Sequence, residues 1–397
     1  MKTLYPFFLA RALGSLGNEL LGFAVPLLVY KITKSLGWSG LAFFIEWVPR
    51  LLSFPLSGVW VDRFGPRRMY LFADALRFIT GGFAIAFIVV FPSTAVFAVL
   101  IIGVIGGFSF ELAFLSVEKV IQEKVPDQEM SKAQAILGSI DHTMMLLGPA
   151  LAAVLVSFWS TTAVLCAMVF LFLCSFVLFL WTVPPSTHAP PSKVSMLDAL
   201  LEGVRFVIGN HRLRAIVMLT TLVNALVGLS LTVAPAMVKS TYGSSDGWLG
   251  VLYTASGIAG LIAVSSTPLL ASWWGLHRLG VTAFIASCIA FFVAGVAPCY
   301  LIYALSVSCL MAFGGSFTVF IRSERALLIP KNIFGRTVGV IILLNFLPMP
   351  LIGLITAAIG DYIGPVMLIK ATAISCFLLS LPLLWPLWSK PANLTHS

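Results

Sequence analysis

The feature that most constrains this chain is a series of long apolar runs, each close to the length that crosses a bilayer. A helix needs about 20 apolar residues to cross a hydrocarbon core of ~30 Å. Of the 397 residues, 59% are hydrophobic and only 10% are charged, whereas a soluble domain carries roughly 25% charged residues. The sequence therefore predicts an all-α membrane protein with many transmembrane helices.

Polar residues and prolines divide the apolar material into twelve runs. They lie at about 5–30, 37–61, 69–91, 95–118, 133–157, 162–182, 213–238, 247–270, 279–297, 300–322, 337–359 and 366–388. Between the sixth and seventh runs lies a polar interval with apolar residues at helical spacing: Leu197, Leu200, Leu201 and Val204. We expect a six-helix bundle at 1–182, a cytoplasmic linker with a membrane-surface amphipathic helix at 183–212, and a second bundle at 213–397.

The distribution of Lys and Arg predicts the orientation. With a cytoplasmic N-terminus, 17 of the 24 Lys and Arg fall in cytoplasmic segments, and four (Lys31, Lys34, Lys239 and Lys370) fall on the opposite side. Positive residues accumulate in cytoplasmic loops. We therefore expect both termini in the cytoplasm.

The two halves of the chain share short motifs in the same order. "GWSGLAF" at 37–43 recurs as "GWLGVLY" at 247–253, and "GGFSF" followed by "VEK" is echoed by "GGSFT" followed by "SER". Two halves repeated in parallel are typical of transporters whose substrate site lies between the halves near the bilayer midplane.

Charged residues inside the apolar runs are candidate functional residues, because each costs about 2.5–3.5 kcal/mol at the bilayer centre. Glu46 and Arg50 have i,i+4 spacing, which suits an ion pair, and form either a structural pair or a pair lining a cavity. Asp74 and Arg77 have i,i+3 spacing near the cytoplasmic end of their run, which favours a gate or a structural role.

Other charged residues have no opposite charge within one turn of their own helix. These are Glu19, beside Asn18, and Glu111. Lone intramembrane carboxylates are typical proton carriers. Asp141 and His142 are further candidates, because imidazole titrates near neutral pH. Proton coupling, substrate binding and structural hydrogen bonding stay open for each of them.

The turn "SGVWVDRFGPRR" at 57–68 concentrates charge between the second and third runs. Gly65 and Pro66 predict a tight turn, with Pro66 at the first position of the next helix. Asp62 faces the negative end of its helix dipole, so its carboxylate needs a partner from elsewhere. A partner present in only one conformation would make this turn a latch.

Residues of this turn resemble a motif of a known protein family. The pattern Gly58, Asp62, Arg63, Gly65, Arg67 and Arg68 resembles the loop between helices two and three of the major facilitator superfamily. The segments "FLARALGSLGNELLGFAVPLLVYKITKS" and "DRFGPRRMYLFADALR" are similar to its bacterial branch of macrolide-type efflux pumps and the enterobactin exporter.

The resemblance implies twelve helices in two pseudo-symmetric six-helix bundles, in the inner (plasma) membrane of a bacterium. It also implies that Asp62 docks near Arg336, at the start of helix eleven, in the outward-open state. This chain departs from the pattern twice: many members carry an aspartate where it has Asn18, and the second copy of the turn, "SWWGLHR" at 272–278, lacks the aspartate.

Several function classes lack their sequence motifs. There is no GxxxxGK[ST] loop and no HExxH, so we expect neither an ATP-driven pump nor an enzyme. The cysteines have no CxxC spacing, and the basic residues form no stripe interleaved with aromatics. We expect no cofactor, no metal site and no nucleic-acid partner.

The sequence favours a proton-coupled exporter of a siderophore or similar amphiphilic organic molecule, which works by alternating access. Gly148-Pro149 resembles a motif associated with exporters in this superfamily. The alternatives are a macrolide-like multidrug pump, an importer of the same fold and a non-transporting receptor. The expected partners are a small organic substrate, protons and the lipid bilayer, and we expect a monomer.

Overall fold

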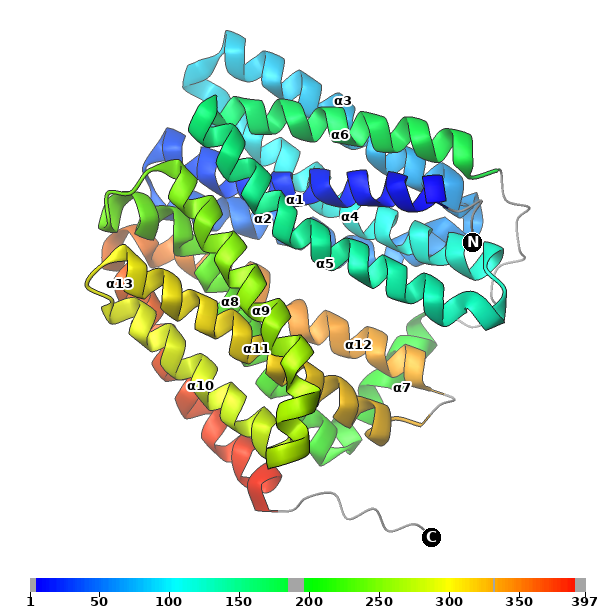
Figure 1. Ribbon diagram of the computed structural model, residues 1–397, viewed down its shortest axis with the longest axis vertical. Coiled ribbons are helices and arrows are strands. Elements are labelled where there is room, and N and C mark those ends of the chain that lie inside the picture. Colours follow the sequence, from blue (N-terminus) through cyan, green and yellow to red (C-terminus); the bar gives the residue numbers. More distant parts are fainter. Residues whose placement is uncertain (1–4, 185–195, 331–332, 390–397) are drawn as a thin grey trace. The chain divides into compact units, whose positions relative to one another are not determined.

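The computed structural model describes residues 5–184, 196–330 and 333–389, and a few side chains within these ranges are not described. Within these ranges the secondary structure is helical and contains no strand. The helices are α1 (Tyr5–Thr33), α2 (Leu36–Phe64), α3 (Pro66–Val90), η2 (Pro92–Thr94), α4 (Ala95–Lys124), α5 (Asp127–Phe158), α6 (Thr161–Thr182), α7 (Met196–Gly209), α8 (His211–Ala236), η3 (Met237–Thr241), α9 (Asp246–Trp274), α10 (Leu276–Val296), α11 (Tyr300–Leu328), α12 (Phe334–Phe346) and α13 (Pro348–Ser389) (Figure 1).

Ten of the described helical segments are long and apolar enough to cross a membrane. They leave out α2 and count Thr337–Leu384 as one stretch of 48 residues. Within that stretch the backbone leaves the helical region at Gly364 (φ 75°, ψ 165°), between the eleventh and twelfth predicted runs. The chain is thus a helical protein with many candidate spans.

The chain forms two compact units, which we describe separately. Unit 1 comprises Met1–Pro191 and Val238–Thr254, and unit 2 comprises Ser192–Met237 and Ala255–Ser397. In unit 1, α1 contacts α2, α4, α5 and α6, and α3 packs against α4 and α6. Figure 1 shows α1 and α6 running side by side. α1 and α4 each touch four other α-helices, so these two helices are central to unit 1.

The core of unit 1 is apolar and aromatic near the first turns of α1. Phe7, Tyr70 and Phe179 are almost completely buried there, and the Tyr70 ring stacks on the Phe179 ring with centroids 3.8 Å apart. This packing joins α1, α3 and α6, which fixes the position of the charged residues one to two turns further along α1.

Two turns at matched positions have the same backbone shape. Gly65, between α2 and α3, has φ 86° and ψ 145°, and Gly275, between α9 and α10, has φ 80° and ψ 135°. This region of dihedral space is accessible essentially to glycine alone. Gly275 follows Gly65 by 210 residues, which is the offset between the repeated "GW" motifs, so the backbone repeats along with the sequence.

The predicted run at 337–359 is interrupted. α12 ends at Phe346 and α13 begins at Pro348, yet Leu347 keeps helical dihedral angles (φ −54°, ψ −35°). Pro348 and Pro350 lack the backbone N–H groups that would continue the helix. The interruption is therefore a local loss of hydrogen bonds without a turn of the chain.

The predicted amphipathic stretch forms helix α7 in unit 2. The buried residue that anchors it is Val207, which packs with Leu213, Val217 and Ile341. Leu201 is exposed, and the side chains of Leu197 and Leu200 lie outside the described part of the structure. Whether α7 lies on a membrane surface stays a prediction.

Candidate functional site

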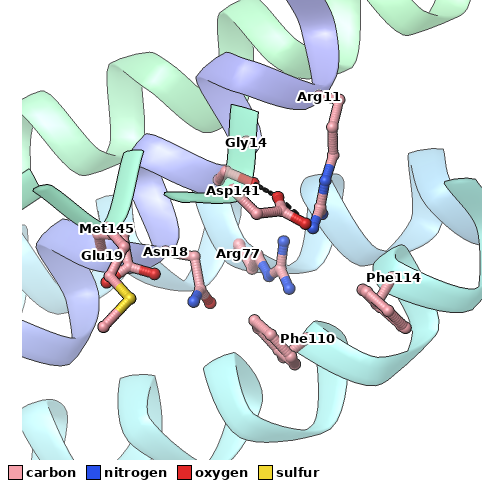
Figure 2. Close-up of a pocket in the computed structure, with 10 residues that line it drawn as sticks. Arg11, Gly14, Asn18, Glu19, Arg77, Phe110, Phe114, Asp141 and Met145 are labelled. Carbon is pink, nitrogen blue, oxygen red and sulfur yellow. Dashed lines mark hydrogen bonds and ion pairs between the residues drawn. The ribbon is translucent and has the colours of Figure 1, made fainter. Parts of the chain in front are cut away.

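One face of α1 carries a row of polar side chains in an otherwise apolar helix. Ser15 follows Arg11 by four residues, and Asn18 and Glu19 follow Ser15 by three and four, which is the spacing that brings side chains together on a helix surface. All four line a cavity of about 220 Å³ in unit 1. The complete lining is Arg11, Gly14, Ser15, Asn18, Glu19, Arg77, Phe110, Phe114, Asp141 and Met145 (Figure 2).

The cavity contains an ion pair between α1 and α5. The Nη2 atom of Arg11 lies 2.9 Å from Oδ1 of Asp141, and the Ser15 hydroxyl donates to the same oxygen at 3.0 Å. Residues 11 and 141 are 130 positions apart, so spacing along one helix could not reveal this pair. The predicted candidate Asp141 is therefore held by a cation that the sequence analysis did not select.

A second ion pair lies beside the cavity on α3. The Nη1 atom of Arg77 donates to Oδ1 of Asp74 at 3.2 Å, as the i,i+3 spacing indicated. The Ser175 hydroxyl lies 2.6 Å from the other oxygen of Asp74 and within hydrogen-bond distance of the Tyr70 hydroxyl. Asp74 is fully buried and Arg77 is 5% exposed, so this network lies in the core of unit 1.

Glu19 has a different environment from the other acidic residues of the site. Among the described side chains, no hydrogen bond or ion pair to its carboxylate is present. Its side chain lies so close to Gly148 on α5 that a β-carbon added to this glycine would overlap with it. The glycine before Pro149 therefore lets α5 approach α1 at the one acidic residue of the cavity without a partner.

Arg50 pairs with a residue on another helix. Its Nε atom lies 3.0 Å from Oε1 of Glu111 on α4, and its guanidinium lies over the rings of Phe110 and Trp47 at 3.6 and 4.5 Å from their centroids. No ion pair joins Arg50 to Glu46 in the described structure. Glu111, although alone on its helix, is thus a paired residue.

The charged turn between α2 and α3 is joined to α4 and α6. The Asp62 carboxylate lies 2.9 Å from Nζ of Lys119, and Nη2 of Arg67 donates to the Leu180 carbonyl at 2.8 Å. Arg63 lies against the neighbouring Phe64 ring, and Arg68 is exposed. A β-carbon added to Gly58 would meet no neighbour.

Two predicted residues cannot be placed. The side chains of Arg336, the expected docking partner of Asp62, and of His142 lie outside the described side chains. The latch therefore stays a prediction.

A second charged cluster lies at the other end of α1. Nζ of Lys31 lies 2.7 Å from Oδ2 of Asp246 and 3.0 Å from Oγ1 of Thr161, and Lys239 pairs with the other oxygen of Asp246. The Tyr30 hydroxyl hydrogen-bonds to that of Ser240. These contacts attach residues 238–254 to unit 1.

The sequence analysis missed Arg11, Ser15, Phe110, Phe114 and Met145 in the cavity. A usable signal existed for Arg11 and Ser15, which precede Asn18 by seven and three residues on the same helix face. For Phe110 and Phe114 no signal was available, because phenylalanine is common in every run of this chain.

The chain is similar in sequence to a known protein family and to several characterised members of it. The family model described as "Major Facilitator Superfamily" matches residues 7–351. The chain is 24% identical over 338 residues to the enterobactin exporter EntS of Salmonella typhi, covering 84% of this chain and 79% of that protein. It is 25% identical over 319 residues to EntS of Shigella dysenteriae, covering 77% and 72%.

Solved structures show the same fold at lower identity. A bacterial homologue of the iron transporter ferroportin, in an inward-facing state, has a TM-score of 0.77 and 16% identity, and the match covers 98% of this chain and 99% of that one. The nucleoside transporter NupG has a TM-score of 0.74 and 14% identity, with coverage of 98% and 100%.

Proposed function

Because the chain belongs to the major facilitator superfamily, and is thus a multi-pass membrane transporter and not an enzyme, we propose that it is a proton-coupled exporter of a siderophore or similar amphiphilic organic molecule. In this proposal it crosses the bacterial inner membrane twelve times in two six-helix bundles, with both termini in the cytoplasm, and it works by alternating access. The excess of Lys and Arg in the predicted cytoplasmic segments supports the orientation.

The observation that carries the proposal is the polar cavity of unit 1. Arg11, Asp141 and Glu19 line it within helices that are long and apolar enough to span a membrane. Ionisable residues in such helices are expensive and are typically found along substrate and ion pathways. A polar cavity inside an apolar bundle is what a carrier of polar solutes needs.

Glu19 is the proposed proton carrier. Among the other acidic candidates, Asp141 pairs with Arg11 and Glu111 pairs with Arg50. Glu46 forms no ion pair with Arg50 in the described structure, but it does not line the cavity. A carboxylate without a partner can take up and release a proton without first breaking an ion pair. Glu19 also lies on the same helix face as Asn18 and Arg11, so its charge acts on any solute in the cavity.

The relatives support the substrate class. EntS proteins of several enterobacteria are described as enterobactin exporters and match more than three quarters of this chain. Enterobactin, as the substrate that those names give, is therefore the first molecule to test. A small drug-like compound stays the alternative substrate.

Transport into inside-out membrane vesicles tests the function. The lumen of such vesicles becomes acidic during respiration, so a proton-coupled exporter should accumulate labelled enterobactin inside them. Nigericin, which dissipates the pH gradient, should abolish accumulation. Uptake into right-side-out vesicles instead would favour the importer, and no movement in either orientation would refute this substrate.

Glu19→Gln tests the coupling role. The variant should lose gradient-driven accumulation and keep exchange of labelled for unlabelled substrate, because exchange needs no net proton movement. Glu123→Gln, at the exposed end of α4, is the matched control and should accumulate like wild type. Wild-type accumulation in Glu19→Gln would remove Glu19 from the coupling mechanism.

A further inference from the structure

Two arginines that line the cavity have more donors than acceptors. A guanidinium has five N–H donors. The described partners are one carboxylate oxygen each, Asp141 for Arg11 and Asp74 for Arg77. The Nε atoms of both are buried and have no hydrogen-bond partner among the described residues. Both residues are more than nine-tenths buried, at 7% and 5% exposed, and both line the cavity. The N–H groups of their Nη atoms outnumber the described acceptors, so some of them are left for an acceptor in the cavity.

The acidic residues nearby do not use up these donors. Asp74 is fully buried and does not line the cavity, while one oxygen of Asp141 already accepts from both Arg11 and Ser15. Glu19 lines the cavity but forms no ion pair with either arginine. Figure 2 shows Glu19 and Met145 at one end of the view, away from Arg11 and Arg77. One end of the cavity thus holds Arg11 and Arg77 together with the Asp141 carboxylate, and we call it the arginine end; Glu19 lies at the other end (Figure 2).

The arginine end is bounded by two phenyl rings. Phe110 and Phe114 are one turn apart on α4, with parallel rings (4°) whose centroids are 6.4 Å apart. The guanidinium of Arg11 lies 5.8 Å from the Phe114 centroid. In Figure 2 both rings lie below the side chains of Arg11 and Arg77. Phenyl edges and faces favour contact with another aromatic ring.

We propose that this part of the cavity binds an oxyanion carried on an aromatic ring, a carboxylate or an ionised phenol. The anion accepts hydrogen bonds from Arg11 and Arg77, and the ring packs against Phe110 and Phe114. Charge-assisted hydrogen bonds from guanidinium to an oxyanion are among the strong ones.

The size of the cavity sets what enters it. Drug-sized ligands occupy pockets of about 300–1,000 Å³, whereas this cavity has about 220 Å³. It accommodates one ring system with its charged group, so a larger substrate would insert a single aromatic arm. The inference rests on the proposed function, because it assumes that the cavity of unit 1 receives the transported molecule.

Binding of a probe series to the full chain in lipid nanodiscs tests the inference. Tritiated 2-naphthoate, which has both ring and charge, should bind. 2-Naphthamide, which lacks the charge, and trans-decalin-2-carboxylate, which lacks aromaticity, should compete at least ten-fold more weakly. Equal competition by the amide, or no binding of 2-naphthoate, would overturn the proposal.

Variants of the Arg11–Asp141 ion pair distinguish a role in binding from a purely structural role. Asp141→Asn removes the negative charge that competes for Arg11 and should strengthen 2-naphthoate binding several-fold. Arg11→Gln/Asp141→Asn keeps the net charge and should weaken binding at least ten-fold. If Arg11 and Asp141 serve packing alone, Asp141→Asn weakens binding or leaves it unchanged, and that result contradicts the proposal.

Phe114→Leu tests the aromatic wall. It should weaken 2-naphthoate binding several-fold and leave binding of the decalin carboxylate unaltered. Phe83→Leu, a 73% exposed phenylalanine on α3, is the matched control and should bind like wild type. If Phe114→Leu bound 2-naphthoate as strongly as wild type, the Phe114 ring would not contribute to the site.

The outcomes separate the two proposals. Enterobactin transport with no preference for 2-naphthoate over its amide refutes the anion site and leaves the exporter standing. Selective 2-naphthoate binding without accumulation of enterobactin in vesicles supports the anion site and refutes the substrate proposed for transport.

Discussion

Among single residues, Arg50 illustrates how a charge inside an apolar bundle finds its partner. The i,i+4 spacing suggested Glu46, but the guanidinium reaches across to Glu111 and stacks on Phe110. A β-carbon added to Gly107 would overlap with the Glu46 carbonyl oxygen. This close approach of α2 and α4 brings Arg50 within reach of Glu111, one turn beyond Gly107.

A charge swap tests that pairing. Arg50→Glu and Glu111→Arg should each reduce the yield of folded protein, because each places like charges together in a low-dielectric interior. The double swap should restore much of the yield, while Arg50→Glu/Glu46→Arg should not. The measurement is monodisperse protein recovered by size-exclusion chromatography, and equal rescue by both double variants would show that Arg50 has no preferred partner.

The buried network around Asp74 makes a stability prediction. Asp74→Asn leaves the Arg77 guanidinium buried without its counter-charge, and removing one partner of a buried pair costs about 3–5 kcal/mol. We expect a clearly lower melting temperature in detergent, with much of the loss recovered in Asp74→Leu/Arg77→Leu. Lys124→Gln, at an exposed position, should melt like wild type; Asp74→Asn melting at the wild-type temperature would contradict this assignment.

The sequence predicted residue pairs unevenly. Asp74 and Arg77 were recognisable because both lie on one helix three residues apart. Arg11 with Asp141, and Asp62 with Lys119, join different helices. A single sequence does not say which helices are neighbours, so these pairs could not be derived from spacing.

Among the helices, the contact between α1 and α5 depends on a missing side chain. Gly148 lies against Glu19, and an added β-carbon would overlap with it. Gly148→Ala should therefore push α5 away from Glu19, lower the melting temperature and reduce gradient-driven accumulation. Gly82→Ala, where an added β-carbon meets nothing within 4 Å, should change neither quantity; identical behaviour of the two variants would show that the contact is not tight.

Helix positions were predictable where hydrophobicity defined them. The run at 162–182 corresponds to α6 at Thr161–Thr182, whereas the run at 95–118 belongs to a helix that extends to Lys124. Backbone hydrogen bonding continues beyond the apolar stretch, because Glu and Lys are good helix formers. Hydropathy marks what can be buried in lipid and does not mark where a helix ends.

For the whole molecule, the orientation is the expectation with the most direct test. In a variant without the six native cysteines, Ser93→Cys lies in the segment between α3 and α4, which we expect outside the cytoplasm. A membrane-impermeant maleimide should label it in spheroplasts and should label Arg68→Cys only in inside-out vesicles. The reverse pattern would invert the proposed topology.

Fold class and family could be predicted from the whole chain, because twelve apolar runs and one charged turn involve most of its length. The family match over residues 7–351 confirms the resemblance. The cavity could not be predicted, because its lining comes from α1, α3, α4 and α5. Composition gives the number of charged residues in the chain, but it does not show which of them lie together in the folded structure.

The matched glycines at 65 and 275 have a consequence for protein engineering. The second loop has the same glycine-only backbone conformation but has Ser272 where the first has Asp62. The backbone conformation of this loop therefore does not depend on the acidic residue. A chimera that carries "DRFGPRR" at 272–278 should therefore close that loop without strain. It would give that loop an acidic group and raise its arginines from one to three, installed as a cassette of seven residues.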